Sequence, residues 1–286
     1  MYAQKVLKGV IILTNNSCDS YTFDLLKHDL AAIKDICPSV PIFSVGKSVL
    51  GRDIYAIKLG TGPRRIFFGA AFHGMEWLTA KILVTFAAEL CDGGEVSLPR
   101  GTTVYLVPMV NPDGVEIAAG GKRWQANARG VDINHNFDAL WDLSKKLEQS
   151  HGINSPGATR YGGEYPESEP ETRAIADFTR LNRFDAVFAL HSQGEVIYYD
   201  FCGYIPNGTE DYLTRFEAAS RYVRDEAEGI AAYGGYKDWF IKKFKKPGFT
   251  IEVGKGENPL PMSYFAEAYG GVRPILREAV DLTYKY

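Results

Sequence analysis

An apolar segment that stops abruptly at a histidine constrains this chain more than any other feature. Residues 66–72 are a continuous apolar run with aromatic members and a glycine, which is typical of a strand buried on both faces. Residues 77–90 are rich in helix formers, and apolar side chains recur there every four residues. His73 and Glu76 therefore lie between a predicted strand and a predicted helix, where ligands bind in open α/β sheets.

The spacing of His73 and Glu76 allows both side chains to reach one ion. A gap of three residues lets an imidazole and a carboxylate converge on a single metal. Alternatively, Glu76 only complements the dipole of the following helix, and His73 only ends the strand. A histidine and a glutamate at this spacing also occur by chance, so the motif needs support from elsewhere in the chain.

Length and composition favour one large α/β domain. The chain has 286 residues, 45% of them hydrophobic, and it contains no linker, repeat or low-complexity tract. We expect an N-terminal extension at residues 1–21 and a single domain at residues 22–286. The net charge of -3 argues against a nucleic-acid binder, and the four cysteines are too widely spaced for a zinc knuckle or a dithiol motif.

The N-terminal region carries one short apolar piece, at residues 10–13. This piece is too short for a transmembrane helix, and no convincing cleavage site follows it. We therefore expect no membrane insertion and a cytoplasmic protein, with a removed leader as the alternative.

Hydrophobic periodicity and helix or strand breakers predict an alternation of strands and helices. Together these elements predict a three-layer α/β/α fold with a mixed, mostly parallel central sheet. An edge hairpin should begin the sheet, a turn should occupy residues 111–114, and residues 120–170 should form a long binding loop. The predicted helices are 22–36, 77–90, 169–182, 211–228, 237–246 and 272–284, and the predicted strands are 41–45, 53–59, 66–72, 102–109, 186–190 and 249–253.

A second buried strand also ends in a histidine, His191. Together with His73 and Glu76 it would complete a zinc site that keeps one position open for water. His135 and His151 are competing third ligands from predicted loops, and His191 could instead be a buried neutral histidine. Zinc is favoured over magnesium or calcium because two imidazoles dominate the ligand set.

Glu252 lies within the apolar strand at residues 249–253. An ionised carboxylate there is costly unless it faces a cleft, another charge or a water on the metal. Desolvation would raise its pKa, which suits a general base. The alternative is that Thr250 and Glu252 mark the solvent face of an edge strand.

Five ordered motifs resemble those of the zinc carboxypeptidase family, and the resemblance covers residues 22–285. It implies a zinc carboxypeptidase-like fold with one zinc ion. The motifs are His73-Gly-Met-Glu76, Asn111-Pro-Asp-Gly114, Arg129-Gly-Val-Asp-Ile-Asn134, His191-Ser192 and Phe249-Thr-Ile-Glu252.

Within that family the chain most resembles the bacterial γ-D-glutamyl-meso-diaminopimelate peptidases, which cut peptidoglycan stem peptides. Ser168-Glu-Pro-Glu-Thr172, His191-Ser-Gln-Gly-Glu195 and Gly235-Tyr-Lys-Asp-Trp239 carry this narrower likeness. The resemblance implies a zinc metallopeptidase that acts on a peptidoglycan-derived peptide. A general zinc carboxypeptidase or amidohydrolase and a non-catalytic muropeptide-binding module are the alternatives, and the oligomeric state is open.

The resemblance also implies a role for each matching residue. His73, Glu76 and His191 would hold zinc, and Glu252 would be the general base and proton shuttle. Three further roles follow, with ordinary turn and surface chemistry as their alternative: Arg129 would stabilise the oxyanion, Asp132 would accept a hydrogen bond from His73, and Asn134 would contact the substrate carboxylate.

The chain departs from the family pattern at the substrate-binding positions. His135 stands where the family has an arginine that clamps a terminal carboxylate, and a mostly neutral imidazole cannot supply that bidentate contact. Lys237 would pair with a second substrate carboxylate, and Asp238 would receive the amine of diaminopimelate. The flexible tyrosine of the family has no clear counterpart, so Tyr233 and Tyr236 are its candidates.

Overall fold

The computed structural model describes residues 19–92 and 98–282, so most of the predicted N-terminal extension lies outside the described residues. Short 3-10 helices η1 to η4 lie at Gly74–Glu76, Ile133–His135, Gly229–Ala232 and Met262–Tyr264. The helices are α1 (Phe23–Ile36), α2 (Trp77–Asp92), α3 (Pro112–Ala119), α4 (Trp141–Ser150), α5 (Pro170–Asn182), α6 (Thr209–Ala219), α7 (Tyr236–Phe244) and α8 (Phe265–Asp281). The strands are β1 (Ile42–Lys47), β2 (Asp53–Gly60), β3 (Arg64–Ala70), β4 (Thr102–Val107), β5 (Ala186–His191), β6 (Val196–Tyr198), β7 (Val223–Asp225) and β8 (Gly248–Glu252).

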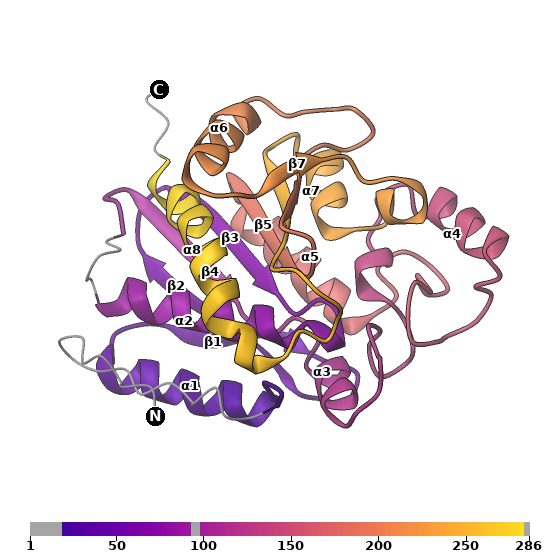
Figure 1. Cartoon of the computed structure of the whole chain (residues 1–286), viewed down its shortest axis with the longest axis horizontal. Coiled ribbons are helices and arrows are strands. Elements are labelled where there is room, and N and C mark those ends of the chain that lie inside the picture. Colours follow the sequence, from indigo (N-terminus) through magenta and orange to yellow (C-terminus); the bar gives the residue numbers. More distant parts are fainter. Residues whose placement is uncertain (1–18, 93–97, 283–286) are drawn as a thin grey trace.

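The strands form one eight-stranded sheet in the order β1-β2-β4-β3-β5-β8-β6-β7 (Figure 1). Its centre is parallel, through the pairs β4 with β3, β3 with β5, and β5 with β8. The β1–β2, β2–β4 and β6–β8 pairs are antiparallel, and the predicted hairpin of β1 and β2 lies at one edge. The predicted mixed sheet with a parallel core is therefore confirmed.

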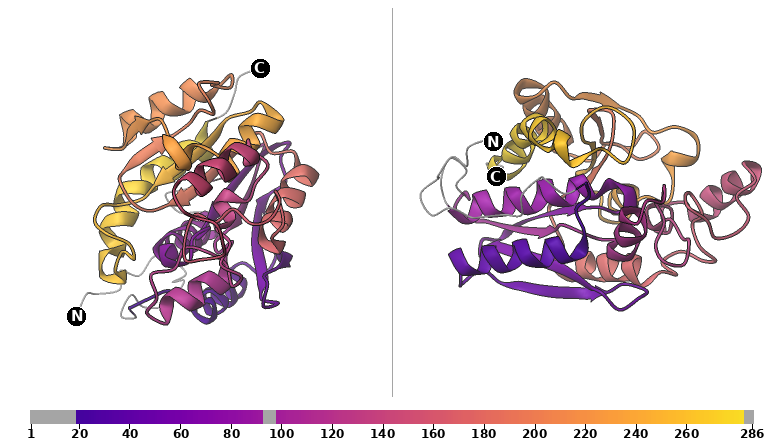
Figure 2. Two further views of the ribbon diagram at one scale, coloured as in Figure 1. Left: turned by 90° about the vertical axis from the view of Figure 1, so that its right-hand side faces the viewer. Right: turned by 60° about the horizontal axis from the view of Figure 1, so that its bottom comes forward.

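Helices cover both faces of this sheet (Figure 2), because the central strands are apolar on both sides. Successive residues of β3 illustrate the division: Ile66 and Phe68 belong to one core cluster, and Phe67 belongs to the other. The first cluster is completed by α1, α2, α6 and α8, and the second by α5 and α7. The three-layer prediction is confirmed. Among the described helices, none combines the length and apolar content needed to cross a bilayer.

Aromatic packing ties together the three strands that carry the site. The Phe188 ring of β5 stacks on Phe68 of β3 at a centroid distance of 4.8 Å and on Phe249 of β8 at 5.2 Å. All three rings are fully buried, and such pairs contribute about 0.5–1.5 kcal/mol each beyond the area they bury. The carboxyl ends of these strands are consequently held at fixed separations.

Two predicted irregular segments contain helices. Residues 111–114 are the start of α3, because the Asn111 side chain caps the helix by accepting a hydrogen bond from Gly114 N at 2.9 Å, with Pro112 in the first turn. The predicted loop at residues 120–170 includes α4. That helix has no apolar periodicity to reveal it, since its buried positions are Trp141, Ser144 and Glu148.

The predicted helix at residues 211–228 is also too long. Helix α6 ends at Ala219, and residues 223–225 form β7, which pairs with β6. Both strands have three residues, too few for an alternating pattern to be visible in the sequence.

Candidate metal centre

The sheet brings together three residues from distant parts of the chain. His73 comes shortly after β3, and His191 and Glu252 are the last residues of β5 and β8. These strands are adjacent and parallel, and His191 lies opposite Glu252 in the register. The predicted ligands and the predicted base therefore meet at the carboxyl edge of the sheet, where α/β proteins bind their ligands.

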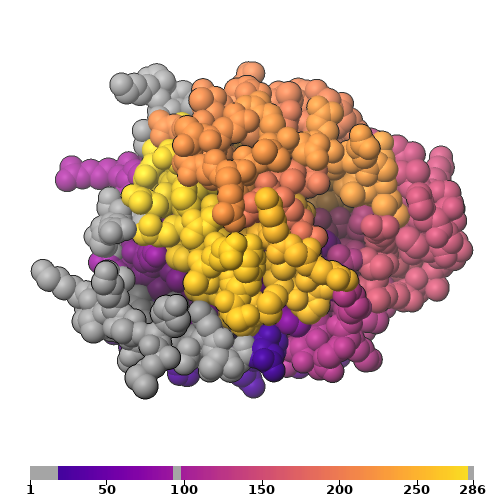
Figure 3. All heavy atoms as spheres, in the orientation of Figure 1, coloured from indigo at the N-terminus to yellow at the C-terminus, as the bar shows by residue number. Residues whose placement is uncertain are grey.

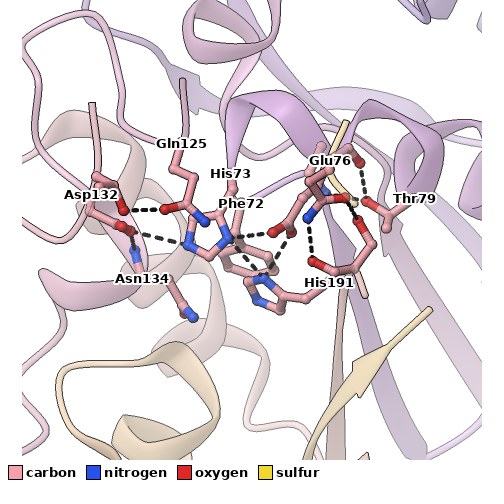
Figure 4. A network of polar contacts seen from close by, with 12 residues as sticks. Phe72, His73, Glu76, Thr79, Gln125, Asp132, Asn134 and His191 are labelled. Atoms are coloured by element: carbon pink, nitrogen blue, oxygen red, sulfur yellow. Dashed lines mark hydrogen bonds and ion pairs between the residues drawn. The ribbon is translucent and has the colours of Figure 1, made fainter. Parts of the chain in front are cut away.

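His73, Glu76 and His191 point at one another (Figure 4). His73 Nδ1 lies 2.8 Å from Glu76 Oε1, His191 Nδ1 lies 3.0 Å from Glu76 Oε2, and the two Nδ1 atoms are 3.2 Å apart. One ligand atom from each residue lies within 4.8 Å of the others, so the set could hold a metal ion. The predicted third ligand is thus His191, whereas neither His135 nor His151 joins the cluster.

The donor set fits zinc. Two imidazole nitrogens and one carboxylate are the protein ligands of many catalytic zinc sites, which leave a further position open. His73 Nε2 contacts Asp132 Oδ1 at 3.2 Å, as predicted, and this contact directs Nδ1 toward the cluster. Asp132 is held in turn by hydrogen bonds from Asn134 N and Arg160 N.

The turn that presents His73 depends on close backbone contacts. A Cβ atom on Gly74 would lie 2.3 Å from the carbonyl oxygen of Gly114, so no larger residue fits there. Gly74 N donates to Gln125 O at 2.9 Å, which joins this turn to a second loop. Thr79 accepts a hydrogen bond from Ala71 N and donates one to Glu76 O, which fixes the turn from the helix side.

The electrostatics of the cluster follow from this packing. Burial opposes ionisation of Glu76, but His73 and His191 outweigh burial and lower its pKa to about 2. Burial likewise disfavours a charged His73, yet Glu76 and Asp132 raise the pKa of His73 well above its usual value. The site thus holds negative charge that a cation can neutralise.

Glu252 lies beside this cluster and faces a cleft. Burial and the charge of Glu76 raise the pKa of Glu252 to about 8. Strand β8 lies between β5 and β6, so the solvent-edge alternative for Thr250 and Glu252 is wrong. Both side chains instead line the cleft above the metal ligands.

The cleft has a volume of about 560 Å³ and opens where Figure 3 shows a hollow between the orange and magenta parts of the chain. Besides the site residues above, it is lined by Gln125, Asn134, His135, Arg160, Tyr198, Asp225, Glu226, Glu228, Lys237 and Asp238.

The comparison with known families decides what this cleft belongs to. A family model described as zinc carboxypeptidase matches residues 26–273. The chain belongs to the zinc carboxypeptidase family. It is therefore a zinc metallopeptidase, and the cluster of His73, Glu76 and His191 could bind one metal ion.

Individual relatives agree with this assignment. Gamma-D-glutamyl-L-diamino acid endopeptidase 1 of Lysinibacillus sphaericus is 35% identical, over 89% of this chain and 70% of its own length. The structure of bovine thrombin-activatable fibrinolysis inhibitor, in complex with tick carboxypeptidase inhibitor, has a TM-score of 0.76 at 21% identity and covers 91% of this chain and 96% of that chain. The murein-tripeptide amidase MpaA of Escherichia coli O157 has a TM-score of 0.59 at 20% identity, over 88% of this chain and 97% of that chain.

In this member of the zinc carboxypeptidase family, Arg129 does not line the cleft of the metal ligands, which corrects its predicted position. Asn127 folds the chain into a tight turn by accepting hydrogen bonds from Arg129 N and Val131 N. The turn directs Arg129 toward Glu169, at 3.5 Å, where it lines a second cavity of about 220 Å³. Its exposed guanidinium therefore lies outside the cleft that His73 lines.

Lys237 and Asp238 line the cleft as predicted, but they pair with each other. Lys237 Nζ donates to Asp238 Oδ1 and to the carbonyl of Asp200, and both side chains are buried. The separate roles predicted for them, as partners of a substrate carboxylate and a substrate amine, do not fit this arrangement.

Neither predicted tyrosine lines the cleft. Tyr236 is fully buried, and its hydroxyl bonds to Thr179 at 2.9 Å. Tyr233 packs against the second core cluster and does not line the cleft. Asn134 does line it, although its amide oxygen also accepts a hydrogen bond from Tyr236 N and so holds the start of α7.

Several cleft residues were missed in the sequence, among them Tyr198, Gln125 and Arg160. Tyr198 lies opposite Thr250 in the register of β6 and β8, on the face that carries Glu252, but its strand is too short to predict. Gln125 and Arg160 lie in the long loop, and only contacts with residues distant in sequence bring them to the cleft. Figure 4 shows Gln125 beside His73, and its Oε1 accepts a hydrogen bond from Thr159 Oγ1.

Proposed function

We propose that this zinc metallopeptidase hydrolyses the γ-D-glutamyl-meso-diaminopimelate amide bond of peptidoglycan stem peptides. The main support for a hydrolytic role is that His73, Glu76 and His191 converge next to Glu252. The substrate class is supported by the relative named gamma-D-glutamyl-L-diamino acid endopeptidase 1, at 35% identity.

A bound zinc ion would polarise the substrate carbonyl and lower the pKa of water, which is the chemistry that such ions supply. The protein's own contribution is proton transfer and positioning. Glu252 accepts the proton of the attacking water on its carboxylate and passes it to the nitrogen of the leaving amine. Asp132 keeps His73 in the tautomer that presents Nδ1 to the cluster.

Gln125 is the residue that we assign to the developing oxyanion, in place of Arg129. Its amide oxygen is engaged by Thr159, which leaves the NH₂ group as the donor toward the cleft. Its backbone is fixed by the hydrogen bond from Gly74 N, one residue from His73. A fixed donor of this kind stabilises charge that develops in the transition state.

Incubation of the zinc-loaded protein with the stem tripeptide L-alanyl-γ-D-glutamyl-diaminopimelate tests the proposal. We expect release of free diaminopimelate, its loss on chelation and its return with zinc. Glu252→Gln should lower turnover by about 10²–10⁴-fold while zinc binding persists.

Two results would reject this function. Cleavage of a blocked C-terminal dipeptide without cleavage of the tripeptide would assign a general carboxypeptidase. Stoichiometric zinc with no turnover of any muropeptide would assign a non-catalytic binding module.

A further inference from the structure

We propose that Arg160 binds a free carboxylate of the peptide substrate and so contributes to its selection. This inference rests on the proposed function, because that substrate carries carboxylates on both sides of the scissile amide. It gives the cleft a carboxylate contact that neither His135 nor Lys237 provides.

In the described part of the chain, Arg160 is the arginine or lysine of the cleft that has no ion-pair partner. Only Arg160 and Lys237 bring such side chains to the cleft lining within those residues. Lys237 is buried and bonded to Asp238 and to the carbonyl of Asp200. Arg160 is exposed, and its guanidinium has no hydrogen bond or ion pair within residues 19–92 and 98–282.

The backbone of Arg160 is held close to the metal ligands through the carboxylate of Asp132. Its N–H donates to Asp132 Oδ2 at 2.9 Å, and the other oxygen of that carboxylate contacts His73. Asp132 N donates in turn to the carbonyl of Tyr161 at 2.8 Å. Arg160 also has a φ of 63°, a left-handed conformation that non-glycine residues rarely adopt and that clusters at functional sites.

The other charges of the cleft restrict where a carboxylate can bind. Asp225, Glu226 and Glu228 are exposed on the cleft lining and repel an anion. Arg160 is therefore the favourable contact for a substrate carboxylate. Its guanidinium presents a planar fork that matches a carboxylate with two parallel hydrogen bonds, which a lysine cannot reproduce.

Three free carboxylates of the substrate share this chemistry. One is the α-carboxylate of the γ-linked glutamyl residue, and the other two belong to the diaminopimelate residue that leaves. Peptides that carry carboxamides on one or the other residue distinguish the two sources.

The experiment compares wild type with Arg160→Gln and Arg160→Lys on three peptides: unmodified, glutamyl α-carboxamide, and a peptide with both diaminopimelate carboxylates as carboxamides. We expect Arg160→Gln to raise KM for the unmodified peptide by roughly 10–100-fold, with partial rescue in Arg160→Lys. For the peptide that lacks the contacted carboxylate, wild type and Arg160→Gln should have the same KM. Arg129→Gln is the matched control, since it removes an exposed arginine outside the cleft.

An equal loss on all three peptides would overturn the role of Arg160 while the proposed function stands. If the wild type cleaves none of them, the proposed function fails. The role of Arg160 is then tested by calorimetric measurement of how the same peptides bind to the zinc-loaded proteins. A preference for the carboxylate over the carboxamide that Arg160→Gln abolishes would support the inference. The same affinity for all three peptides in the wild type would reject it.

Discussion

At the scale of single residues, the site depends on side chains in which one polar atom is held by a neighbour, so that another polar atom faces the cluster or the cleft. His73 presents one ring nitrogen to the cluster because Asp132 holds the other. Gln125 offers an amide to the cleft because Thr159 engages its oxygen. Arg129 lacks such placement, since its turn directs it away toward Glu169.

Gln125→Ala should therefore lower kcat by about 10²–10³-fold with little change in KM, because the lost donor acts mainly on the transition state. Steady-state hydrolysis of the stem tripeptide measures both constants. Arg129→Ala is the companion variant and should stay within about twofold of wild type. The reverse ranking of the two variants would return the oxyanion role to Arg129.

At the scale of elements, buried polar side chains join the segments around the site. Asn111 caps α3 and donates from Nδ2 to the carbonyls of Phe72, Gln125 and Ala126 at 3.1–3.2 Å. It therefore connects the end of β3, the start of α3 and the loop of Gln125. The composition of residues 111–114 indicated only a turn, because these contacts are distant in sequence.

Asn111→Ala should destabilise the fold by about 2–4 kcal/mol, since it removes a cap and leaves the carbonyls of Phe72 and Ala126 without their donor. Urea unfolding with zinc absent isolates this effect from metal binding. Asn182→Ala, which removes one partly buried hydrogen bond at the end of α5, should cost less than about 1 kcal/mol. Equal costs for the two variants would contradict the connecting role of Asn111.

Glu195 joins the segment after β5 to the segment between α6 and β7, and its effect depends on pH. Burial alone would raise the pKa of Glu195, but Arg221 and Lys255 outweigh burial and lower it. Because the folded pKa lies below the unfolded value of 4.5, this stabilisation is present above that pH and is lost as the pH falls through the folded pKa.

Glu195→Gln should therefore be less stable than wild type by about 1–2 kcal/mol at pH 7, with a difference that shrinks below about pH 4.5. Urea midpoints measured between pH 7 and 3 follow this change. Glu267→Gln is the control, because Glu267 is exposed and its contact with the same arginine is long, at 3.8 Å. A stability difference that is constant over this range would contradict the assignment.

At the scale of the whole molecule, the parallel core determines which parts of the site a sequence can reveal. His73, His191 and Glu252 each lie at the end of an apolar strand, and adjacent parallel strands bring such ends together. Tyr198, Gln125 and Arg160 had no comparable local signal. Lys237 and Asp238 were placed in the right cleft, but their mutual ion pair depends on how α7 packs, which the sequence pattern does not reveal.

The most direct test of the account is a zinc titration of chelator-treated protein, followed by the rate of tripeptide hydrolysis. Activity should be absent without metal and should rise linearly to a plateau at one zinc ion per chain, because His73, Glu76 and His191 form one site. Activity that survives metal removal, or that needs a second equivalent of zinc, would contradict the account.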